Sequence, residues 1–397
     1  MSNRSRRDSS GRRAGRSSQS QQVAARPAAA LVSAGILTAL ALMYVTLLLA
    51  APTVLPPFMR WGLGPTAPEA SKEGRISFVR LLEGQAQSLF VVNPDGTNQQ
   101  QLTHDIIIDQ NSWSPDGRYI VAQAQFNGVA AILRVEVGPD NKPVELLNLT
   151  DGDTTESVFP AWSPDGTQIA VQSKRGGGDW QIHVMKADGT DKRMVTDGKG
   201  QAKFPTWSPD SQSIGYVLSD GQSASGEIHV IPAAGGAARA VTGNGSVKTN
   251  PIWTRDGQSI VFAQGSGDRI QAIAVVPVAG GEVRDITEPA SIRSLQLSPA
   301  TPPRLAYHRV LVESQGTDIL TVPLEGGTPT VVTPDNGEDY LPAWSPDGTR
   351  LTWASSRPEN PTPGYKIVVG NVDGSGVKVV SSGAGTDFQP QWAPAAK

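Results

Sequence analysis

The sequence predicts an all-β protein, a seven-bladed β-propeller, and three observations support this fold class. The pentapeptide Trp-Ser-Pro-Asp-Gly, or a close variant, recurs along the chain at intervals of 44 to 49 residues. Each interval holds four short extended segments separated by turn residues, which is the content of one propeller blade. The repeats span about 320 of the 397 residues, so one closed array accounts for most of the chain.

Each repeat has an anchor, the Trp or its replacement, at the expected end of the first strand of a blade. The fifth repeat is degenerate, because Leu replaces the Trp and Ala300 replaces the Asp. If that unit is not a blade, the count falls to six, and six blades remain the alternative. The anchors are Trp113, Trp162, Trp207, Trp253, Leu297, Trp344 and Trp392.

The repeat around the second anchor illustrates the order of elements that we expect in a blade. Strands are predicted at residues 159–163, 168–172, 180–185 and 193–196. The turn after the first strand is Pro164-Asp165-Gly166, in which Pro presets φ, Asp bonds to its own backbone and Gly supplies a positive φ. The same pattern of elements recurs in the other repeats.

The two ends of the array complement each other. Residues 75–103 supply second, third and fourth strands but no anchor, whereas residues 388–392 supply only a first strand. We therefore expect the C-terminal strand to complete the first blade. Such closure removes exposed sheet edges, which otherwise invite aggregation.

The N-terminal part predicts a membrane anchor. Residues 1–26 carry seven Arg and one Asp and are expected to form a disordered basic tail. Residues 28–51 contain no charged side chain. This apolar run is long enough to span a bilayer as a helix, and the positive-inside rule puts the tail in the cytoplasm and the propeller outside. We predict domains at 1–26 (cytoplasmic tail), 27–51 (single-pass signal anchor), 52–73 (Pro/Gly-rich spacer) and 74–397 (propeller). A cleaved signal peptide is the alternative.

Composition excludes several classes of function. The chain contains no cysteine, which rules out disulfides, thiolate metal sites and a cysteine nucleophile. Beyond the basic tail the net charge is −9, since the whole chain is at −3 and residues 1–26 contribute +6. Nucleic acid is therefore not an expected partner, because it requires a basic face.

The repeat Pro-x-Trp-Ser-Pro-Asp-Gly is followed by Ile-Ala-Val-x-Ser, then by Gln-Ile-His-Val-Met-Lys-Ala-Asp-Gly-Thr, and then by a terminal Leu-Thr or Val-Thr. This spacing resembles the TolB-type β-propeller repeat, which also resembles the propellers of prolyl-oligopeptidase-like enzymes. The resemblance covers about residues 75–397. It implies an extracytoplasmic binding scaffold, and we expect no counterpart of the α/β domain that precedes the propeller in TolB.

The variable rim of the propeller is the expected binding site. One rim holds the repeated turns, and we read its Asp residues as turn residues, with a cation-binding ring of acids as the alternative. On the other rim, residues just before the first strands are expected to converge on the mouth of a central channel. These candidate residues are Asp109, Glu156, Lys203, Lys248, Asn250, Arg293, Asp339, Tyr340, Asp387 and Phe388.

The charges of this set predict a dipolar mouth. Lys203, Lys248 and Arg293 lie on consecutive blades, and the four acids occupy the opposite arc. Such a mouth suits a zwitterionic or peptide-like ligand, or a chain terminus. Ordinary solvated rim charges are the alternative.

Catalytic motifs are largely missing from the sequence. The four histidines are His104, His183, His229 and His308, and no His-Glu-x-x-His, nucleophile elbow or phosphate loop occurs. We predict no metal, no cofactor and no enzyme. The predicted function is membrane-tethered, non-catalytic binding of an envelope protein, peptide or glycan. The alternatives are a glycan-active enzyme that uses Asp109, Asp339 or Asp387, and a purely structural assembly module.

Overall fold

The computed structural model describes residues 73–395, apart from residues 83, 85, 105, 154, 176–177, 223–224, 267–268, 312–315, 335–336, 358–359, 361 and 363. The segments predicted as tail and membrane anchor, and residues 52–72 of the spacer, lie outside this part. Within the described residues, no helix has the length and apolar character needed to cross a bilayer.

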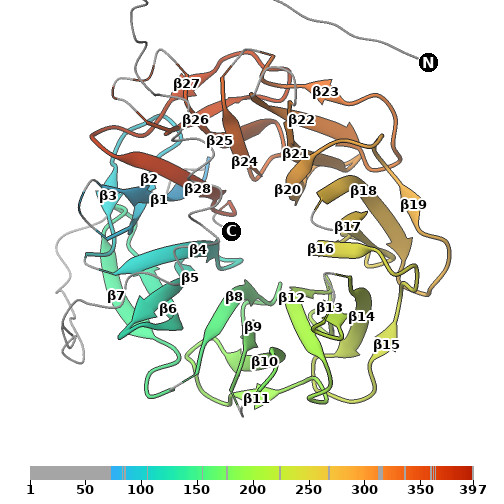
Figure 1. Cartoon of the computed structure of the whole chain (residues 1–397). Coiled ribbons are helices and arrows are strands. Elements are labelled where there is room, and N and C mark those ends of the chain that lie inside the picture. Colours follow the sequence, from blue (N-terminus) through green and yellow to red (C-terminus); the bar gives the residue numbers. More distant parts are fainter. Residues whose placement is uncertain are drawn as a thin grey trace, which may run out of the picture. The chain divides into compact units, whose positions relative to one another are not determined.

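Seven four-stranded antiparallel sheets form a ring, which confirms the seven-bladed propeller (Figure 1). We number the blades in chain order, so that blade 1 contains the first strand of the described chain. The strands nearest the ring axis are, from blade 1 to blade 7, β28 (Thr386–Trp392), β4 (Ile107–Trp113), β8 (Ser157–Trp162), β12 (Gln201–Trp207), β16 (Val247–Trp253), β20 (Ile292–Leu297) and β24 (Asp339–Trp344).

The two middle strands of every blade are longer than the outermost strand in most blades. Successive side chains along each of them point to opposite faces of the sheet. The second strands are β1 (Ile76–Leu81), β5 (Tyr119–Phe126), β9 (Gln168–Ser173), β13 (Ser213–Ser219), β17 (Ser259–Ser266), β21 (Arg304–Val310) and β25 (Arg350–Ser355). The third strands are β2 (Ser88–Val92), β6 (Val129–Val137), β10 (Gln181–Lys186), β14 (Glu227–Pro232), β18 (Arg269–Pro277), β22 (Thr317–Pro323) and β26 (Lys366–Asn371).

The outermost strands are mostly very short. They are β3 (Gln100–Gln101), β7 (Pro143–Asn148), β11 (Arg193–Met194), β15 (Arg239–Ala240), β19 (Arg284–Asp285), β23 (Thr330–Val331) and β27 (Lys378–Val379). Short outer strands limit the exposed sheet edge, which protects a propeller against edge-to-edge aggregation. The outer strand predicted at residues 193–196 was too long, because β11 contains only Arg193 and Met194.

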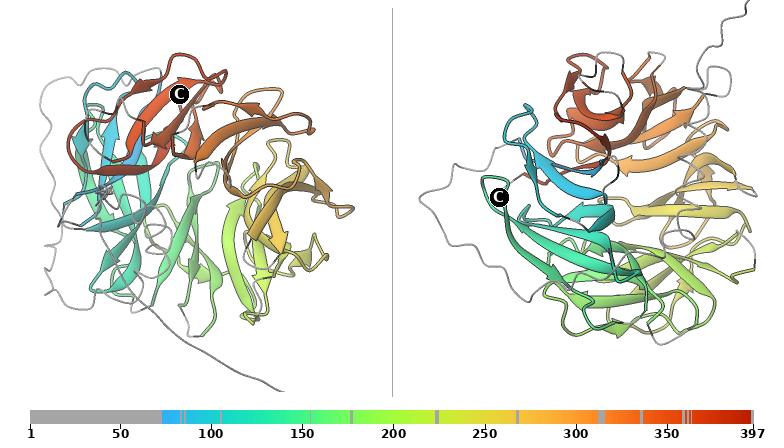
Figure 2. Two further views of the ribbon diagram at one scale, coloured as in Figure 1. Left: turned by 45° about the horizontal axis from the view of Figure 1, so that its top comes forward. Right: turned by 60° about the vertical axis from the view of Figure 1, so that its left-hand side comes forward.

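Shared-strand closure is confirmed. β28 pairs antiparallel with β1, with Ile76 opposite Trp392 and Leu81 opposite Thr386. The C-terminal strand thus lies beside the first strands of the described chain, as Figure 2 shows from two further sides. The ring has no free innermost strand.

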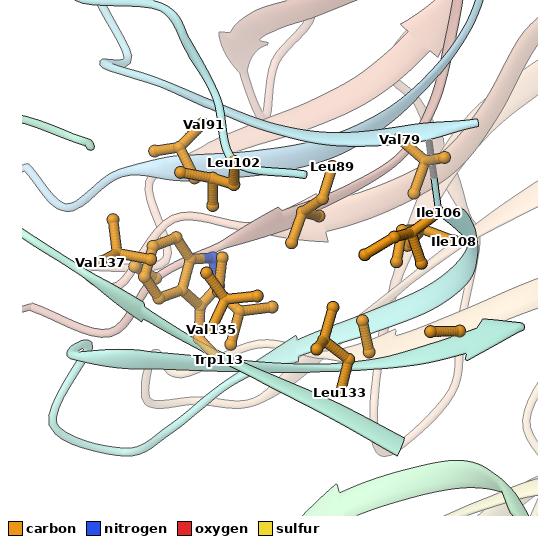
Figure 3. Close-up of a cluster of buried hydrophobic side chains, with 14 residues drawn as sticks. Val79, Leu89, Val91, Leu102, Ile106, Ile108, Trp113, Leu133, Val135 and Val137 are labelled. Atoms are coloured by element: carbon orange, nitrogen blue, oxygen red, sulfur yellow. The ribbon is translucent and has the colours of Figure 1, made fainter. Parts of the chain in front are cut away.

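The hydrophobic core is divided into seven clusters, one at each junction between neighbouring blades. Figure 3 shows the cluster between blades 1 and 2, where Val79 and Leu89 of blade 1 face Trp113 and Leu133 of blade 2. Six clusters contain an anchor Trp. In the seventh, Leu297 packs against the cluster in place of the Trp, so the degenerate repeat still forms a blade.

The repeated turns are built as the sequence predicts. In blade 2, the Ser114 hydroxyl donates to the Asp116 carboxylate at 2.5 Å and accepts from the Tyr119 backbone N–H at 2.9 Å. The Asp116 carboxylate also accepts from the Arg118 backbone N–H at 3.0 Å. The same bonds recur in the turns of Asp165, Asp210, Asp256 and Asp347, so these acids are turn residues.

Candidate functional site

A β-bulge interrupts every innermost strand and sets which side chains stay accessible at the ring axis. The pairing register shifts in all seven strands, and in six of them the residue three places before the anchor has a positive φ between 51° and 58°. A bulge places two residues of one strand opposite one residue of its partner. Nine of the ten predicted site residues lie within the first strands and not before them, which corrects the sequence-based placement; Glu156 alone precedes its strand, β8.

We call the residues four and three places before each anchor the axial pair of that blade. They are Asp109/Gln110, Val158/Phe159, Lys203/Phe204, Thr249/Asn250, Arg293/Ser294, Tyr340/Leu341 and Phe388/Gln389. All are exposed or half-buried except Val158. Six of the ten predicted site residues belong to these pairs: Asp109, Lys203, Asn250, Arg293, Tyr340 and Phe388.

The residue one place earlier, five before the anchor, is buried in every blade, and three predicted site residues occupy this position. Lys248 has 2% exposure, and Asp339 and Asp387 have none. Pleating turns successive side chains to opposite faces of a strand, so this position packs between blades. The predicted dipolar mouth does not form with these three residues, because their charges are satisfied inside the sheets.

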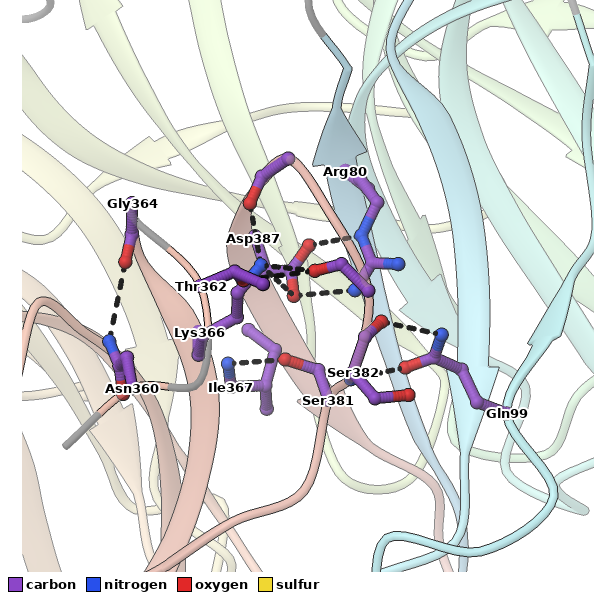
Figure 4. A network of polar contacts seen from close by, with 12 residues as sticks. Arg80, Gln99, Asn360, Thr362, Gly364, Lys366, Ile367, Ser381, Ser382 and Asp387 are labelled. Atoms are coloured by element: carbon purple, nitrogen blue, oxygen red, sulfur yellow. Dashed lines mark hydrogen bonds and ion pairs between the residues drawn. The ribbon is translucent and has the colours of Figure 1, made fainter.

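Asp387 forms a buried ion pair across the closing seam. Its carboxylate accepts from Arg80 Nε at 2.5 Å and from Arg80 Nη2 at 2.8 Å, and Lys366 Nζ lies 3.9 Å away (Figure 4). Lys366 also donates to the carbonyl oxygens of Gly383 and Gly385. Burial lowers the pKa of Lys366, while the nearby Asp387 carboxylate opposes that shift.

Lys248 forms a similar pair between blades 4 and 5. Here the innermost strand supplies the cation and the third strand of the preceding blade supplies the acid, whereas Asp387 and Lys366 have the opposite arrangement. Lys248 Nζ lies 3.0 Å from the Glu227 carboxylate and donates to the carbonyl oxygens of Gly226 and Ser246. Asp339 accepts from Trp353 Nε1 at 2.8 Å, and Arg357 lies 4.0 Å from its second oxygen. The tenth predicted residue, Glu156, is half-buried and pairs with Lys174 at 2.6 Å.

Asp109 is the acid of the axial pairs, and amide groups surround it. Its carboxylate accepts from Gln389 Nε2 at 3.1 Å and from Gln123 Nε2 at 3.2 Å. Burial raises the pKa of Asp109, while the bond from Gln389 opposes that shift. Two neutral donors thus hold this carboxylate, and no cation pairs with it in the described structure.

Lys203 and Arg293 are the two cations of the axial pairs. Lys203 is half-buried on β12, and Arg293 is exposed on β20. Across residues 73–395, apart from the gaps given above, neither side chain has a hydrogen bond or an ion pair. Arg293 lies opposite His308 in the pairing of β20 with β21.

Aromatic side chains supply much of the remaining axial surface. Phe159 and Phe204 pack edge to face, with ring centroids 5.0 Å apart. Tyr340 packs in the same way against His308 at 5.3 Å. The predicted site residues did not include Phe159 or Phe204, although counting three places back from each anchor finds both.

His308 supports the bulge of the next blade. Its Nδ1 accepts from the Leu341 backbone N–H at 3.4 Å, and its side chain is buried. Burial, and then the charge of Arg293, lowers the pKa of His308 to about 3. The imidazole is therefore neutral at physiological pH, as an acceptor must be.

Two hollows lie away from the axial pairs. One, of about 230 Å³, lies at the repeated turns of blades 2 and 3, between Pro115, Tyr119, Trp162 and Pro164. The other holds about 10 Å³ beside His183. In the described part of the chain, no group of three or more His, Asp or Glu residues is placed to hold a metal ion.

Comparison with known proteins finds a family model and curated relatives that match parts of the propeller. Residues 153–303 match the family model of the TolB β-propeller domain. An uncharacterized peptidase, YuxL of Bacillus subtilis, is 39% identical over 69 residues, which are 17% of this chain and 10% of that protein. The Tol-Pal system protein TolB of Hamiltonella defensa is 28% identical over 111 residues, 28% of this chain and 24% of that protein. The chain thus matches a quarter or less of the length of these two curated relatives.

Solved structures share the fold at low sequence identity. TolB from Acinetobacter baumannii has a TM-score of 0.50 at 18% identity, covering 83% of this chain and 68% of that one. A puromycin hydrolase has a TM-score of 0.60 at 14% identity, with 80% and 54% covered. An oligogalacturonate lyase in complex with manganese has a TM-score of 0.56 at 13% identity, with 78% and 86% covered. The described part of this chain is therefore a seven-bladed β-propeller, and its residues 153–303 match the TolB type.

Proposed function

We propose that this protein is a non-catalytic binding scaffold of the cell envelope and that its partner docks on the axial pairs. The observation that carries the proposal is the contrast between a frame that repeats with few changes and axial pairs that vary. Turns, anchors and bulges repeat from blade to blade, whereas the axial pairs differ in charge, size and polarity. Variable side chains on a rigid frame are the usual arrangement of a recognition surface.

We propose further that residues 27–51 anchor the protein as a single-pass helix, with the tail in the cytoplasm and the propeller outside. The uncharged run 28–51 and the Arg-rich segment before it support this topology. The absence of native cysteine allows a direct test. In intact cells, a membrane-impermeant maleimide should label Asn244→Cys and leave Ser9→Cys unlabelled. Labelling of Ser9→Cys alone would contradict the orientation.

Site-specific photo-crosslinking tests the binding function. A photoreactive phenylalanine at Phe388 or Tyr340 of the full-length chain should capture a discrete envelope partner in cells. The same probe at Val331, which is exposed on the outermost strand β23, is the matched control. The axial docking site is refuted if the axial probe and the Val331 probe capture the same products, or if the axial probe captures none.

A glycan-active enzyme is the second candidate, and Asp109 is the residue that favours it. A carboxyl group with a raised pKa suits a general acid, and Asp109 has that property. The second acid that glycoside hydrolysis requires is harder to assign, since Asp339 and Asp387 are buried. Release of sugars from envelope polysaccharide that Asp109→Asn abolishes would favour this candidate over the scaffold.

A further inference from the structure

We infer that the axial face recognises an acidic polypeptide segment, and that Lys203 and Arg293 hold its carboxylates. The inference rests on the proposed binding function and gives the chemistry of the partner. It replaces the zwitterionic ligand that the sequence predicts, because the structure distributes the charges of the axial face differently.

The first step concerns the acids. Of the four acids expected on one arc, Asp387 is paired with Arg80, Glu156 with Lys174, and Asp339 is buried with Trp353 and Arg357 as neighbours. Only Asp109 belongs to an axial pair, and the amide donors of Gln123 and Gln389 occupy both of its oxygens. The acids therefore offer little to a cationic ligand.

The second step concerns the cations. Lys248 is buried against Glu227, whereas Lys203 and Arg293 reach solvent and have no partner in the described ranges. The charge that the axial pairs of blades 4 to 6 present to solvent is therefore positive. A surface that carries charge of one sign attracts ligands of the opposite sign.

The third step concerns the position of the two cations. β16 lies between β12 and β20 in the ring, so blade 5 separates Lys203 from Arg293 (Figure 1). The axial pair of that blade, Thr249 and Asn250, is neutral and accessible, and each side chain offers a donor and an acceptor. A chain with two carboxylates can thus place its polar backbone on blade 5 and one carboxylate on each neighbouring blade.

The fourth step favours a polypeptide over an acidic glycan. Sugars stack on open, flat aromatic faces, but Phe159 and Phe204 are packed edge to face on each other, as are Tyr340 and His308. Phe159, Phe204 and Tyr340, with Leu341 and Phe388, are half-buried and offer apolar surface that suits aliphatic or aromatic side chains. A segment that alternates acidic and apolar residues fits both features.

Fluorescence anisotropy with the full-length protein in detergent tests the inference. The probes are a fluorescein-labelled octapeptide of alternating Asp and Leu and its Lys–Leu counterpart, and an oligomer of galacturonic acid serves as competitor. We expect the acidic peptide to bind, with an affinity that weakens as salt is added. The double variant Lys203→Gln/Arg293→Gln should weaken binding by about tenfold or more. The control Lys186→Gln/Arg239→Gln removes the same formal charge from exposed positions on β10 and β15, outside the innermost strands, and should change the affinity by less than about twofold.

Each other outcome refutes the inference in a defined way. No binding of the acidic peptide, equal binding of the basic peptide, or an unchanged affinity of the axial variant would overturn it. Displacement by the galacturonic acid oligomer at lower concentration than by unlabelled peptide would reassign the site to an acidic glycan. A crosslinked partner whose capture survives Lys203→Gln/Arg293→Gln would leave the scaffold function standing and refute the acidic chemistry alone.

Discussion

At the scale of single residues, burial decides what each charged side chain can do. Asp387 and Lys203 sit one strand position apart in the repeat, five and four residues before their anchors. The first is fully buried in an ion pair, and the second is half-buried without one in the described structure. Residues of similar polarity thus divide into a structural set between the blades and an accessible set at the axis.

Breaking the buried seam pair should be strongly destabilising. Replacement of Arg80 by Met leaves the Asp387 carboxylate without its bidentate partner, and we expect the free energy of unfolding to fall by about 3–5 kcal/mol. Urea unfolding measures this loss. The control Arg118→Met removes an exposed pair with Glu136, whose Arg side chain is 61% exposed, and should cost about 1 kcal/mol or less. Equal losses of stability for both variants would show that the Arg80–Asp387 pair is not a buried, stabilising pair.

The neutral, buried His308 should make stability depend on pH. Burial lowers its pKa from 6.5 to about 3 in the folded protein, so below pH 6.5 the unfolded chain takes up the proton more readily. As the pH is lowered from about 6 to about 3, this residue alone should therefore reduce the free energy of unfolding by about 1.4 kcal/mol for each pH unit.

NMR titration and chemical unfolding check this expectation. The His308 imidazole should keep the chemical shifts of the neutral ring down to about pH 4, and His308→Gln should reduce the slope of stability against pH. Part of the slope will remain, because burial also lowers the pKa of His183 and His229. Protonation of His308 near pH 6.5 would show that the ring is not buried as described.

At the scale of elements, the repeated turn and the bulge each impose a backbone conformation. Gly348 closes the turn of blade 7 with a φ of +70°, a conformation that glycine adopts without steric cost. In blade 4, Ser211 takes the equivalent place with a φ of 61°, and its hydroxyl accepts from the Asp165 backbone N–H at 3.1 Å. A contact with the neighbouring blade thus compensates for the missing glycine.

Gly348 should be the more sensitive of two glycines with the same φ. A Cβ at Gly348 would lie 2.7 Å from the Ala300 Cβ, whereas a Cβ at Gly245, also at +70°, meets nothing within 4 Å. We expect Gly245→Ala to cost about 1–2 kcal/mol from backbone conformation. Gly348→Ala should cost about 1–3 kcal/mol more because of overpacking. Thermal and urea unfolding compare the two, and a larger loss for Gly245→Ala would refute the contact with blade 6.

At the scale of the whole molecule, the ring depends on one non-local pairing. β1 and β28 are joined across nearly the full described sequence, and their pairing leaves no innermost strand unpartnered. Loop-closure entropy opposes such long-range contacts, so the seam is a natural weak point of the array. The buried Arg80–Asp387 pair lies within this seam.

A disulfide across the seam should form and stabilise the ring. Leu81 and Thr386 are register partners at the edge of the sheet, and Leu81 is 42% exposed. The double variant Leu81→Cys/Thr386→Cys should therefore crosslink under mild oxidation and raise the free energy of unfolding by about 2–4 kcal/mol. The chain has no other cysteine, so gel mobility and unfolding report this bond alone. Failure to crosslink, with both thiols still reactive, would contradict the pairing of β1 with β28.

The repeated frame was predictable because each of its determinants is local. The Ser-Pro-Asp-Gly turns, the alternating strands and the anchors recur at a fixed interval, and such periodicity identifies a propeller whatever lies at its axis. Seven blades and the shared strand followed from the count of repeats and from the incomplete units at the two ends. Even Leu297, in place of a Trp, still packs in the cluster between blades 5 and 6.

The site was only partly predictable, because a shift of one residue along a strand moves a side chain to the other face. The sequence alone determined that Lys203, Arg293, Asp109 and their neighbours lie near the start of the innermost strands. Only the tertiary structure decided which of them reach solvent, since the bulge and the packing of adjacent blades bury Lys248, Asp339 and Asp387. Burial depends on contacts between residues some 20 to 300 positions apart, such as Arg80 with Asp387. A local sequence pattern does not reveal such contacts.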